Sequence, residues 1–438
     1  MYRLLRRFSA VDRSMRERLT PAGWLVLGAA LAAAAGGIDL NQTLTAQAFT
    51  LLASLLLLAF AASGAFRARL EAARQMPRYA TVGEDFVYRV TITNRGRAAL
   101  VGATLAEQFR DPRPRFDVWR STREPGEERR NWIDRELGYF RWRWLIERRI
   151  PENASEAPLP VLQPGQSQSV RLAFTPRGRG RIELAGLKVA RAEPLGLVKG
   201  LARVPLEARV IALPKRYRIP VLALPGARKF QQGGVSLSAS VGDSEEFLFL
   251  RDYRPGDPLQ RLHWKSFART GKPIVKEYQD EFFERHALVL DTGTRRSEDA
   301  AFEEAVAVAA SFVYTIDTQE CLLDLLFVGG EVRTFTTGRG QSHAEHMLEV
   351  LAGVSASSPD EFDALACAVL ARRSTLSSVI AVLLAWDEKR RSFIAQARAN
   401  GLEVRALLVC RPEEAPPPEP GVLVLHPGAI ERGLVQLQ

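Results

Sequence analysis

The sequence is poor in the residues that carry most enzyme chemistry. Its 438 residues include three cysteines and five histidines, and these form no Cys-x-x-Cys or His-Glu-x-x-His motif. A Walker A motif and a Gly-x-Ser-x-Gly motif are also absent. Cys321, Cys367 and Cys410 each lie in an apolar stretch, which favours reduced core thiols over a disulfide framework or a zinc site. The sequence therefore predicts no catalytic constellation and no cofactor.

Long uncharged segments occur near the N-terminus, and basic residues flank them. Residues 20–38 and 40–66 carry no charge and are separated by Asp39. Six arginines precede them in residues 1–18 and four follow in residues 67–78, so much of the net charge of +10 lies beside them. A helix of about 19 residues spans roughly 28 Å, close to the hydrocarbon thickness of a bilayer.

This pattern predicts two transmembrane helices in residues 20–66, arranged as a hairpin behind a basic cytoplasmic N-terminus, residues 1–19. The positive-inside rule places both outer ends of the hairpin, and the large C-terminal part, in the cytoplasm. The lipid bilayer is thus an expected partner. A signal sequence is the alternative interpretation of the first run, because a basic segment precedes it.

Residues 79–215 are predicted to form an immunoglobulin-like β-sandwich. Phe86, Tyr88, Val90 and Ile92 occupy alternate positions ahead of a turn at 94–96, which is typical of a half-buried strand. Further short apolar stretches bounded by proline and glycine follow up to residue 215. Such spacing of short strands favours a sandwich.

A charged insertion, residues 110–149, interrupts this β region. It contains twelve arginines, eight acidic residues and four tryptophans. Phe140, Trp142 and Trp144 alternate with arginines, which predicts a strand packed on the sandwich. Contact with the membrane interface is one alternative. Binding of single-stranded nucleic acid is another, but the interspersed acids weaken it, and no nucleic acid is expected as a partner.

Residues 285–438 alternate apolar strand-like runs with helical patterns. The first run ends at Asp291, and the run at 377–387 ends at Asp387. Continuous apolar strands separated by helices indicate a parallel sheet covered on both faces. The chain is therefore expected to be a multidomain protein that ends in a doubly wound α/β domain.

Residues 242–281 fit neither a helical nor a strand period. They mix basic, acidic and aromatic residues, and Pro255-Gly256-Asp257 is turn chemistry. Because arginine both stacks on rings and pairs with carboxylates, this stretch predicts a polar network folded against another surface. The residues expected to form the interaction surface are Glu246, Arg251, Tyr253, Gly256, Asp257, Arg261, Trp264, Lys265, Arg269 and Lys276.

This stretch resembles the signature of the bacterial domain of unknown function 58 family, whose pattern combines Phe-x-x-Leu-Arg-x-Tyr, Pro-Gly-Asp and Arg-x-x-Trp-Lys-x-x-Ala-Arg. In the family a glycine and an acidic residue precede that pattern, and Lys-Glu follows it. Here Gly242 matches the glycine, and Glu245 or Glu246 matches the acidic residue. His263 stands where the family often has aspartate. Residues 178–181 and 193–197 resemble two further family elements, with Glu193 in place of the usual aspartate.

The resemblance implies that the α/β domain, residues 285–438, is similar to a von Willebrand factor A domain. In that fold a D-x-S-x-S loop, a threonine and an aspartate hold a divalent cation. Here Asp291 matches, but Gly293 and Arg295 replace the two serines. We therefore expect a degenerate site and no constitutive metal. The remaining candidate ligands are Asp387 and Thr336 or Thr337.

Proteins of this family typically accompany a MoxR-type AAA+ ATPase and are thought to assist the assembly or maturation of other proteins. The resemblance thus implies a non-catalytic, membrane-anchored adaptor or scaffold of the bacterial inner membrane, whose partners are that ATPase and an unknown client protein. The rival hypothesis is a hydrolytic enzyme with its site in residues 251–269, using Asp257, His263 and Lys265. A third interpretation is that the charges of the signature pair internally and only fix a contact between domains.

Overall fold

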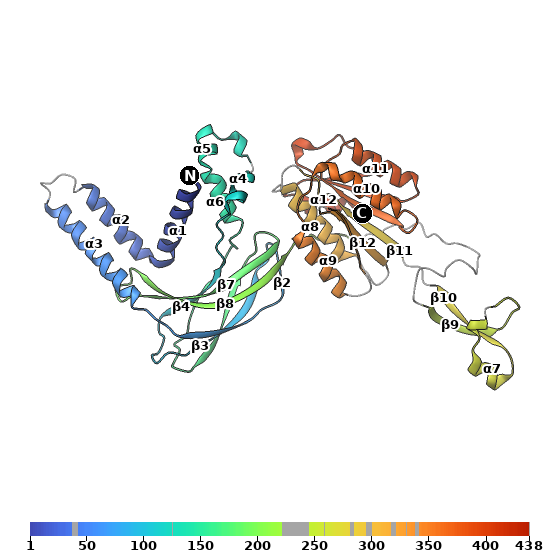
Figure 1. Ribbon diagram of the computed structural model, residues 1–438, viewed down its shortest axis with the longest axis horizontal. Helices are drawn as coiled ribbons and strands as arrows, with labels where there is room; N and C mark the ends of the chain where they lie inside the picture. The colour runs from blue at the N-terminus through green and yellow to red at the C-terminus, as the bar shows by residue number, and fades with distance from the viewer. Residues whose placement is uncertain are drawn as a thin grey trace. The chain divides into compact units, whose positions relative to one another are not determined.

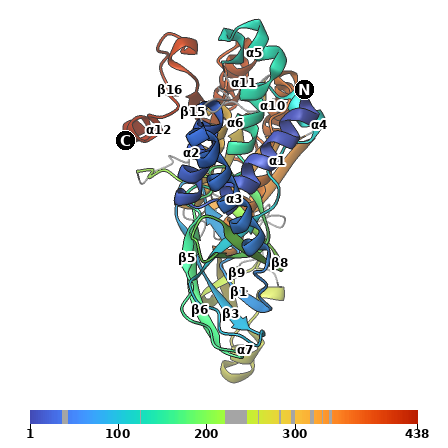
Figure 2. The ribbon, with the colours of Figure 1, turned by 90° about the vertical axis from the view of Figure 1, so that its left-hand side faces the viewer.

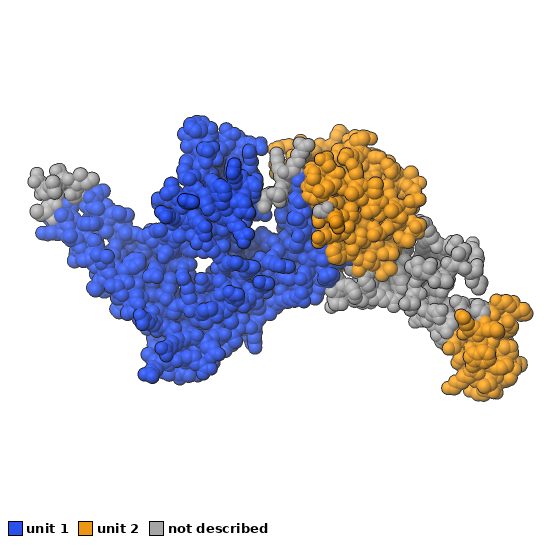
Figure 3. Space-filling view, viewed as in Figure 1, with its two compact units in different colours: residues 1–217, 294–311, 345–356 blue, residues 218–293, 312–344, 357–438 orange. Residues whose placement is uncertain are grey.

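The computed structural model describes residues 1–36, 43–124, 126–220, 245–257, 259–280, 284–294, 300–316, 321–329, 331–337 and 341–437. The chain forms two compact units (Figures 1 and 3). The first comprises Met1–Tyr217, Thr294–Ser311 and Glu345–Ala356, and the second comprises Arg218–Gly293, Phe312–Ala344 and Ser357–Gln438. The chain therefore leaves the first unit and returns to it twice.

Three helices begin the first unit: α1 (Tyr2–Arg18), α2 (Pro21–Gly36) and α3 (Thr43–Gly64). Helices α2 and α3 lie side by side (Figures 1 and 2). By length and composition, the 21 residues Leu44–Gly64 of α3 are apolar enough to cross a membrane. Helix α2 has 16 residues and spans only about 24 Å, less than a bilayer core. In the part of the chain that the structure describes, one helix therefore reaches the length of a transmembrane span, where the sequence predicted two.

Two sheets follow α3. Strands β1 (Leu70–Gln75), β3 (Phe86–Asn94) and β6 (Ser167–Phe174) form an antiparallel sheet. The other sheet has the order β2-β8-β7-β4-β5, with bounds Tyr79–Thr81, Lys199–Leu213, Gly180–Ala192, Ala103–Phe109 and Glu156–Pro158. Both sheets contribute to one hydrophobic core. The predicted alternation of β3 is confirmed, because Phe86, Tyr88, Val90 and Ile92 are all buried in that core.

The insertion between β4 and β5 is helical, so the predicted strand is wrong. It contains α4 (Phe116–Ser121), a short 3₁₀ turn (Glu127–Arg129), α5 (Trp132–Leu137) and α6 (Tyr139–Glu147). Gly138 ends α5 in the left-handed region at φ 59° and leads directly into α6. Trp142 and Leu145, three residues apart, are the buried positions of α6. The alternation of aromatic residues with arginines therefore does not reflect a strand.

The ring of Tyr2 holds α1 against the insertion. It lies 5.3 Å from the ring of Phe116, 5.7 Å from that of Trp119 and 5.4 Å from that of Trp142. The Tyr2 hydroxyl donates a hydrogen bond to the carbonyl of Pro114 at 3.0 Å. Both ribbon views accordingly show α1 beside α4 and α6 (Figures 1 and 2).

A six-stranded sheet has the order β13-β12-β11-β14-β15-β16, parallel except for β13. In chain order, its strands β11 to β16 are Glu284–Leu290, Cys321–Val328, Val332–Thr337, Ser378–Leu383, Glu403–Val409 and Val422–Leu425. Helices α8 to α12 are Ala300–Thr315, Gln341–Gly353, Phe362–Ala371, Glu388–Ala399 and Ile430–Leu434. Alternate residues of β14 are buried on both faces, and α10 and α11 share one of these cores. This is the α/β arrangement that the alternating pattern predicted.

The signature residues form a small sheet of their own. Strands β9 (Glu245–Asp252) and β10 (Ile274–Asp280) pair antiparallel and are joined by α7 (Trp264–Thr270), which follows a 3₁₀ turn (Leu259–Arg261). The expected turn after Tyr253 is present, with Gly256 at φ 107° and the Asp257 N–H bonded to the Arg254 carbonyl. We call residues 245–280 the signature hairpin.

Candidate functional site

Asp257 organises the turn of the signature hairpin. Arg251 donates to both of its carboxylate oxygens, at 2.7 and 2.8 Å, and the Arg254 N–H donates to one of them at 2.8 Å. The hydrogen bonds from Arg251 lower the pKa of Asp257 to about 2, and the Arg254 N–H adds to this effect. Asp257 is therefore a charged acceptor that fixes the turn, and its low basicity makes it a poor general base.

Helix α7 presents the aromatic side chains of the signature to solvent. Trp264 is 62% exposed and contacts the ring of Phe267, which is also exposed. Lys265 and Arg269 lie on the same short helix and are exposed. Grouped aromatic and basic side chains in water are the composition of a protein interaction surface.

Backbone hydrogen bonds connect the strands and the helix of the hairpin. The N–H of Tyr253 bonds to the Pro273 carbonyl at 3.0 Å, and that of His263 bonds to the Ile274 carbonyl at 2.8 Å. His263 occupies the N-cap of α7, where its ring nitrogen Nδ1 lies 2.7 Å from the hydroxyl of Ser266. An aspartate there could cap the helix directly, so this departure from the family pattern has a local effect.

The other signature residues lie on the strands or outside the described positions. Glu246 and Lys276 are on β9 and β10, where Lys276 is opposite Leu250. Gly242 lies outside the described residues, as does the side chain of Arg261. Of the proposed interaction residues, the structure thus brings Arg251 and Asp257 into direct contact and groups Trp264, Lys265 and Arg269 on one helix.

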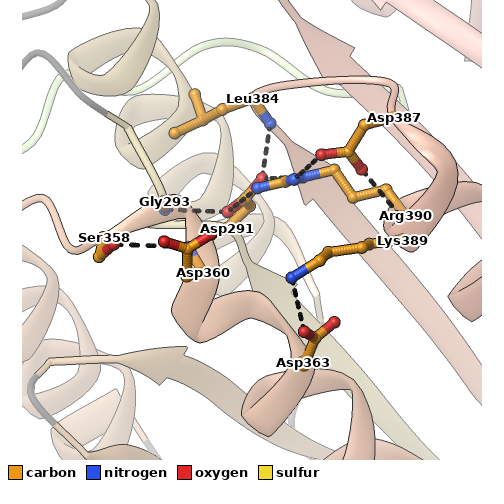
Figure 4. A network of polar contacts seen from close by, with 9 residues as sticks. All are labelled: Asp291, Gly293, Ser358, Asp360, Asp363, Leu384, Asp387, Lys389 and Arg390. Atoms are coloured by element: carbon orange, nitrogen blue, oxygen red, sulfur yellow. Dashed lines mark hydrogen bonds and ion pairs between the residues drawn. The ribbon is translucent and has the colours of Figure 1, made fainter.

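Asp291 lies at the carboxyl end of β11, as the sequence predicted, but its partner is an arginine. Arg390 of α11 donates to both carboxylate oxygens of Asp291, at 2.7 and 3.1 Å (Figure 4). Both side chains are only 1% exposed. Burial alone would lower the pKa of Arg390, but the hydrogen bonds and charge of Asp291 raise it. The guanidinium thus supplies a buried positive charge beside Asp291.

Asp387 joins the same cluster from the start of α11. It accepts a bond from Arg390 Nη1 at 2.6 Å and caps the helix by accepting from the Arg390 N–H at 3.1 Å. Asp291 also accepts from the N–H groups of Gly293 and Leu384, at 2.9 and 3.1 Å. The two carboxylates named as degenerate metal ligands therefore share one guanidinium (Figure 4).

Gly293 allows this close arrangement. A Cβ atom there would lie 3.1 Å from Arg390 Nη2 and 3.0 Å from the Cα of Pro359. A serine at this position, as in a metal-binding loop, would crowd the guanidinium. Arg295, the other departure from that loop, lies outside the described residues.

The threonine assigned to the same site is misplaced. Thr336 lies in β13, where its hydroxyl accepts a bond from Arg285 near the beginning of β11. Asp291 follows the other end of that strand, and six residues of strand span about 20 Å. Thr336 therefore cannot act with Asp291, and the side chain of Thr337 lies outside the described positions. Sequence reasoning missed Arg390, because this residue lies 99 positions from Asp291 along the chain.

The loop between β7 and β8 contains a buried glutamate, Glu193, and contacts the apolar helices. The Glu193 carboxylate accepts bonds from the N–H groups of Leu197 and Val198, at 2.7 and 3.2 Å. Thr20, just before α2, donates its hydroxyl to the carbonyl of Gly196 at 2.6 Å and its N–H to that of Leu197 at 3.0 Å. Glutamate thus fills a role for which the family usually has aspartate, and the loop it orders contacts the start of α2.

Glycines permit the close approach at this junction. A Cβ on Gly23 would lie 2.1 Å from the Leu197 carbonyl oxygen. Gly200, near the start of β8, approaches the segment that follows α3: a Cβ on Gly200 would lie 2.5 Å from the Cβ of Phe66. The start of α2 therefore packs closely on the connection between β7 and β8, and the segment that follows α3 packs closely on the start of β8.

The signature and the α/β sheet together define one family. Residues 250–434 match the family model described as "Protein of unknown function DUF58". A relative from Bacillus subtilis, strain 168, described as "Uncharacterized protein YeaD", is 29% identical over 201 residues. That alignment covers 45% of this chain and 48% of the relative, so the match spans about half the length of each protein. The C-terminal part of this chain is therefore similar to the domain of unknown function 58 family.

Solved structures resemble parts of the chain only weakly. The CARDB domain of a Pyrococcus furiosus protein is 11% identical and has a TM-score of 0.15, covering 31% of this chain and 94% of that domain. A PapD-like domain of human CEP192 is 16% identical with a TM-score of 0.18, covering 33% of this chain and 87% of that domain.

Proposed function

We propose that this chain is a non-catalytic, membrane-anchored adaptor that docks a MoxR-type AAA+ ATPase through the signature hairpin and assists the maturation of a client protein. One observation carries the proposal: Trp264 and Phe267 stand in solvent beside Lys265 and Arg269. Exposed tryptophan and arginine are the side chains that most often dominate binding energy at interfaces.

The contacts of the signature favour docking over an internal polar network. If its charges only fixed the fold, Arg251 and Arg269 would both be buried against carboxylates. Arg251 pairs with Asp257 while remaining partly accessible, and Arg269 is exposed. No specific observation favours a hydrolytic site. The Asp257 carboxylate accepts hydrogen bonds from Arg251 and from the Arg254 N–H, and the His263 ring is hydrogen-bonded to Ser266.

The proposed anchor is the α2–α3 pair in the bacterial inner membrane. Helix α3 supplies a span of sufficient length, and the basic segments on either side favour cytoplasmic ends. We further propose that both helices cross the membrane, with the bilayer thinned locally around the shorter α2, that the C-terminal part is cytoplasmic, and that its α/β sheet is of the von Willebrand factor A type. The strand order, with one antiparallel edge strand, is compatible with that assignment.

Some arginines of the insertion are engaged within the protein, which weakens the nucleic-acid alternative. Arg141 pairs with Glu127, and Arg130 pairs with Glu124 at 2.9 Å. The guanidinium of Arg130 also lies 3.9 Å from the ring centroid of Phe140. These contacts occupy two arginines and one aromatic ring that a nucleic-acid strand could otherwise contact.

The test compares two exposed tryptophans. Trp264→Ala should reduce the affinity of the full-length protein, in non-ionic detergent, for a purified MoxR-type ATPase by about 30-fold, the effect of a 2 kcal/mol interface residue. Trp132→Ala removes a side chain that is 70% exposed on α5 and should leave affinity unchanged. Equal affinity for both variants, or no binding of the ATPase by the unmodified chain, would refute the docking role.

A further inference from the structure

An open cavity of about 380 Å³ lies in the first unit and has no part in the function proposed above. Its walls come from the end of β4, the start of β7 and the segment that follows α6. Five of its lining residues are arginines: Arg110, Arg148, Arg149, Arg179 and Arg181. A volume of this size accommodates a small ligand.

The acidic residues of the cavity are already paired. Glu183 forms an ion pair with Arg110, and Asp111 forms one with Arg113. These pairs leave Arg149 and Arg181 in excess over the carboxylates that line the wall. The cavity therefore carries a net positive charge.

Arg179 forms a fixed part of this wall. Its side chain is 8% exposed, its guanidinium pairs with Glu303 at 3.1 Å, and Nη2 donates to the Val354 carbonyl at 2.7 Å. It also lies 5.1 Å from the ring centroid of Phe302. Despite these partners, desolvation lowers the pKa of Arg179. An additional anion nearby would favour its charged form.

Arg148 and Arg149 follow α6, and burial disfavours the charged form of both guanidinium groups. Arg148 is half-buried and lies 5.1 Å from the ring centroid of Trp144, and desolvation lowers its pKa. Arg149 donates to the Pro112 carbonyl at 3.4 Å. Among the described residues, no carboxylate lies within ion-pair distance of Arg149. Part of its side chain reaches solvent, but desolvation of the rest lowers the pKa of Arg149.

We propose that this cavity binds a phosphate group, carried either by a soluble molecule or by the headgroup of an anionic lipid. Guanidinium groups match the paired oxygens of phosphate and bind them bidentately. Apolar residues such as Phe109, Leu145 and Ile182 line the remaining wall, so the bound group would be partly shielded from water. Asp111 of the cavity also lies 3.9 Å from Arg13 of α1, which places a basic helix next to the site.

The test uses the full-length protein in non-ionic detergent and two arginines from the same segment. Arg149→Gln removes a cavity charge, whereas Arg143→Gln removes an arginine that is 64% exposed, pairs with Glu147 and does not line the cavity. Inorganic pyrophosphate and short-chain phosphatidylglycerol are titrated separately by calorimetry, with short-chain phosphatidylcholine as the zwitterionic control.

At least one anionic probe should bind, Arg149→Gln should weaken it about tenfold or more, and Arg143→Gln should leave it unchanged. Arg149→Lys should retain part of the affinity, which separates a charge effect from misfolding. Pyrophosphate binding indicates a soluble phosphate ligand, whereas binding of phosphatidylglycerol alone indicates a lipid headgroup. Binding of neither probe, equal weakening by Arg143→Gln, or tighter binding of a single-stranded oligonucleotide than of both probes would overturn the proposal.

Discussion

Arg251–Asp257 and Arg390–Asp291 are both bidentate arginine–carboxylate pairs, but their surroundings differ. The first lies in the signature hairpin and is partly accessible to solvent, while the second is almost completely enclosed. An accessible pair is screened by water and contributes little to stability, whereas removal of one partner from an enclosed pair leaves an uncompensated charge. We infer that the enclosed cluster serves the fold and that the hairpin is built to present its surface.

The largest effect should come from breaking the enclosed pair. Arg390→Met leaves Asp291 charged and buried, and should reduce the free energy of unfolding by about 3–5 kcal/mol in denaturant titrations of the detergent-solubilised chain. Arg391→Met, on the next residue of α11, removes a partly exposed arginine and should cost less than about 1 kcal/mol.

The double variant Asp291→Leu/Arg390→Met distinguishes the loss of a pair from the loss of packing. It removes both charges together, so it should be more stable than Arg390→Met alone. A double variant that is no more stable than the single one would show that the shape of the guanidinium, and not its charge, holds the ends of β11 and β14.

The junction between the sandwich and α2 is a tightly packed contact without charged groups, so it shows what close packing alone contributes to stability. Gly23→Ala forces a Cβ to within 2.1 Å of the Leu197 carbonyl unless the helix moves, and should cost about 1–3 kcal/mol. Gly28→Ala, in the same helix, meets nothing within 4 Å and should be neutral or stabilising. Limited proteolysis of the purified chain would report the difference, and equal resistance of both variants would contradict a direct contact between α2 and the loop at Gly196.

The sequence predicted those strands and turns whose formation depends on residues close together in the chain. The alternation of β3, the turn at Gly256 and the strand that ends at Asp291 all follow from patterns shorter than ten residues. The misfit of Gly293 to a metal-binding loop could also be recognised, because a glycine has no hydroxyl to offer.

What the sequence could not predict depends on contacts between distant residues. Arg390 finds Asp291 only after the sheet has formed, and nothing local marks it among many arginines. The arginine cavity likewise combines residues of β4, α6 and β7 that are up to 74 positions apart. The insertion was misread for a different reason, since its aromatic residues happen to alternate while Trp142 and Leu145 are buried at helical spacing.

The smallest effect should come from the accessible pair and should appear in its titration. The pKa of Asp257 is lowered from its ordinary value near 4 to about 2, so the stabilisation it gives the turn is present above pH 4 and is lost as pH falls towards 2. Arg251→Gln should return the pKa of Asp257 towards its ordinary value, as observed by carboxyl chemical shifts of the isotope-labelled chain. Lys265→Gln, on the exposed face of α7, should leave it unchanged. An unshifted Asp257 pKa in the unmodified chain would mean that the turn is open in solution, and the rigid presentation of Trp264 would then have no support.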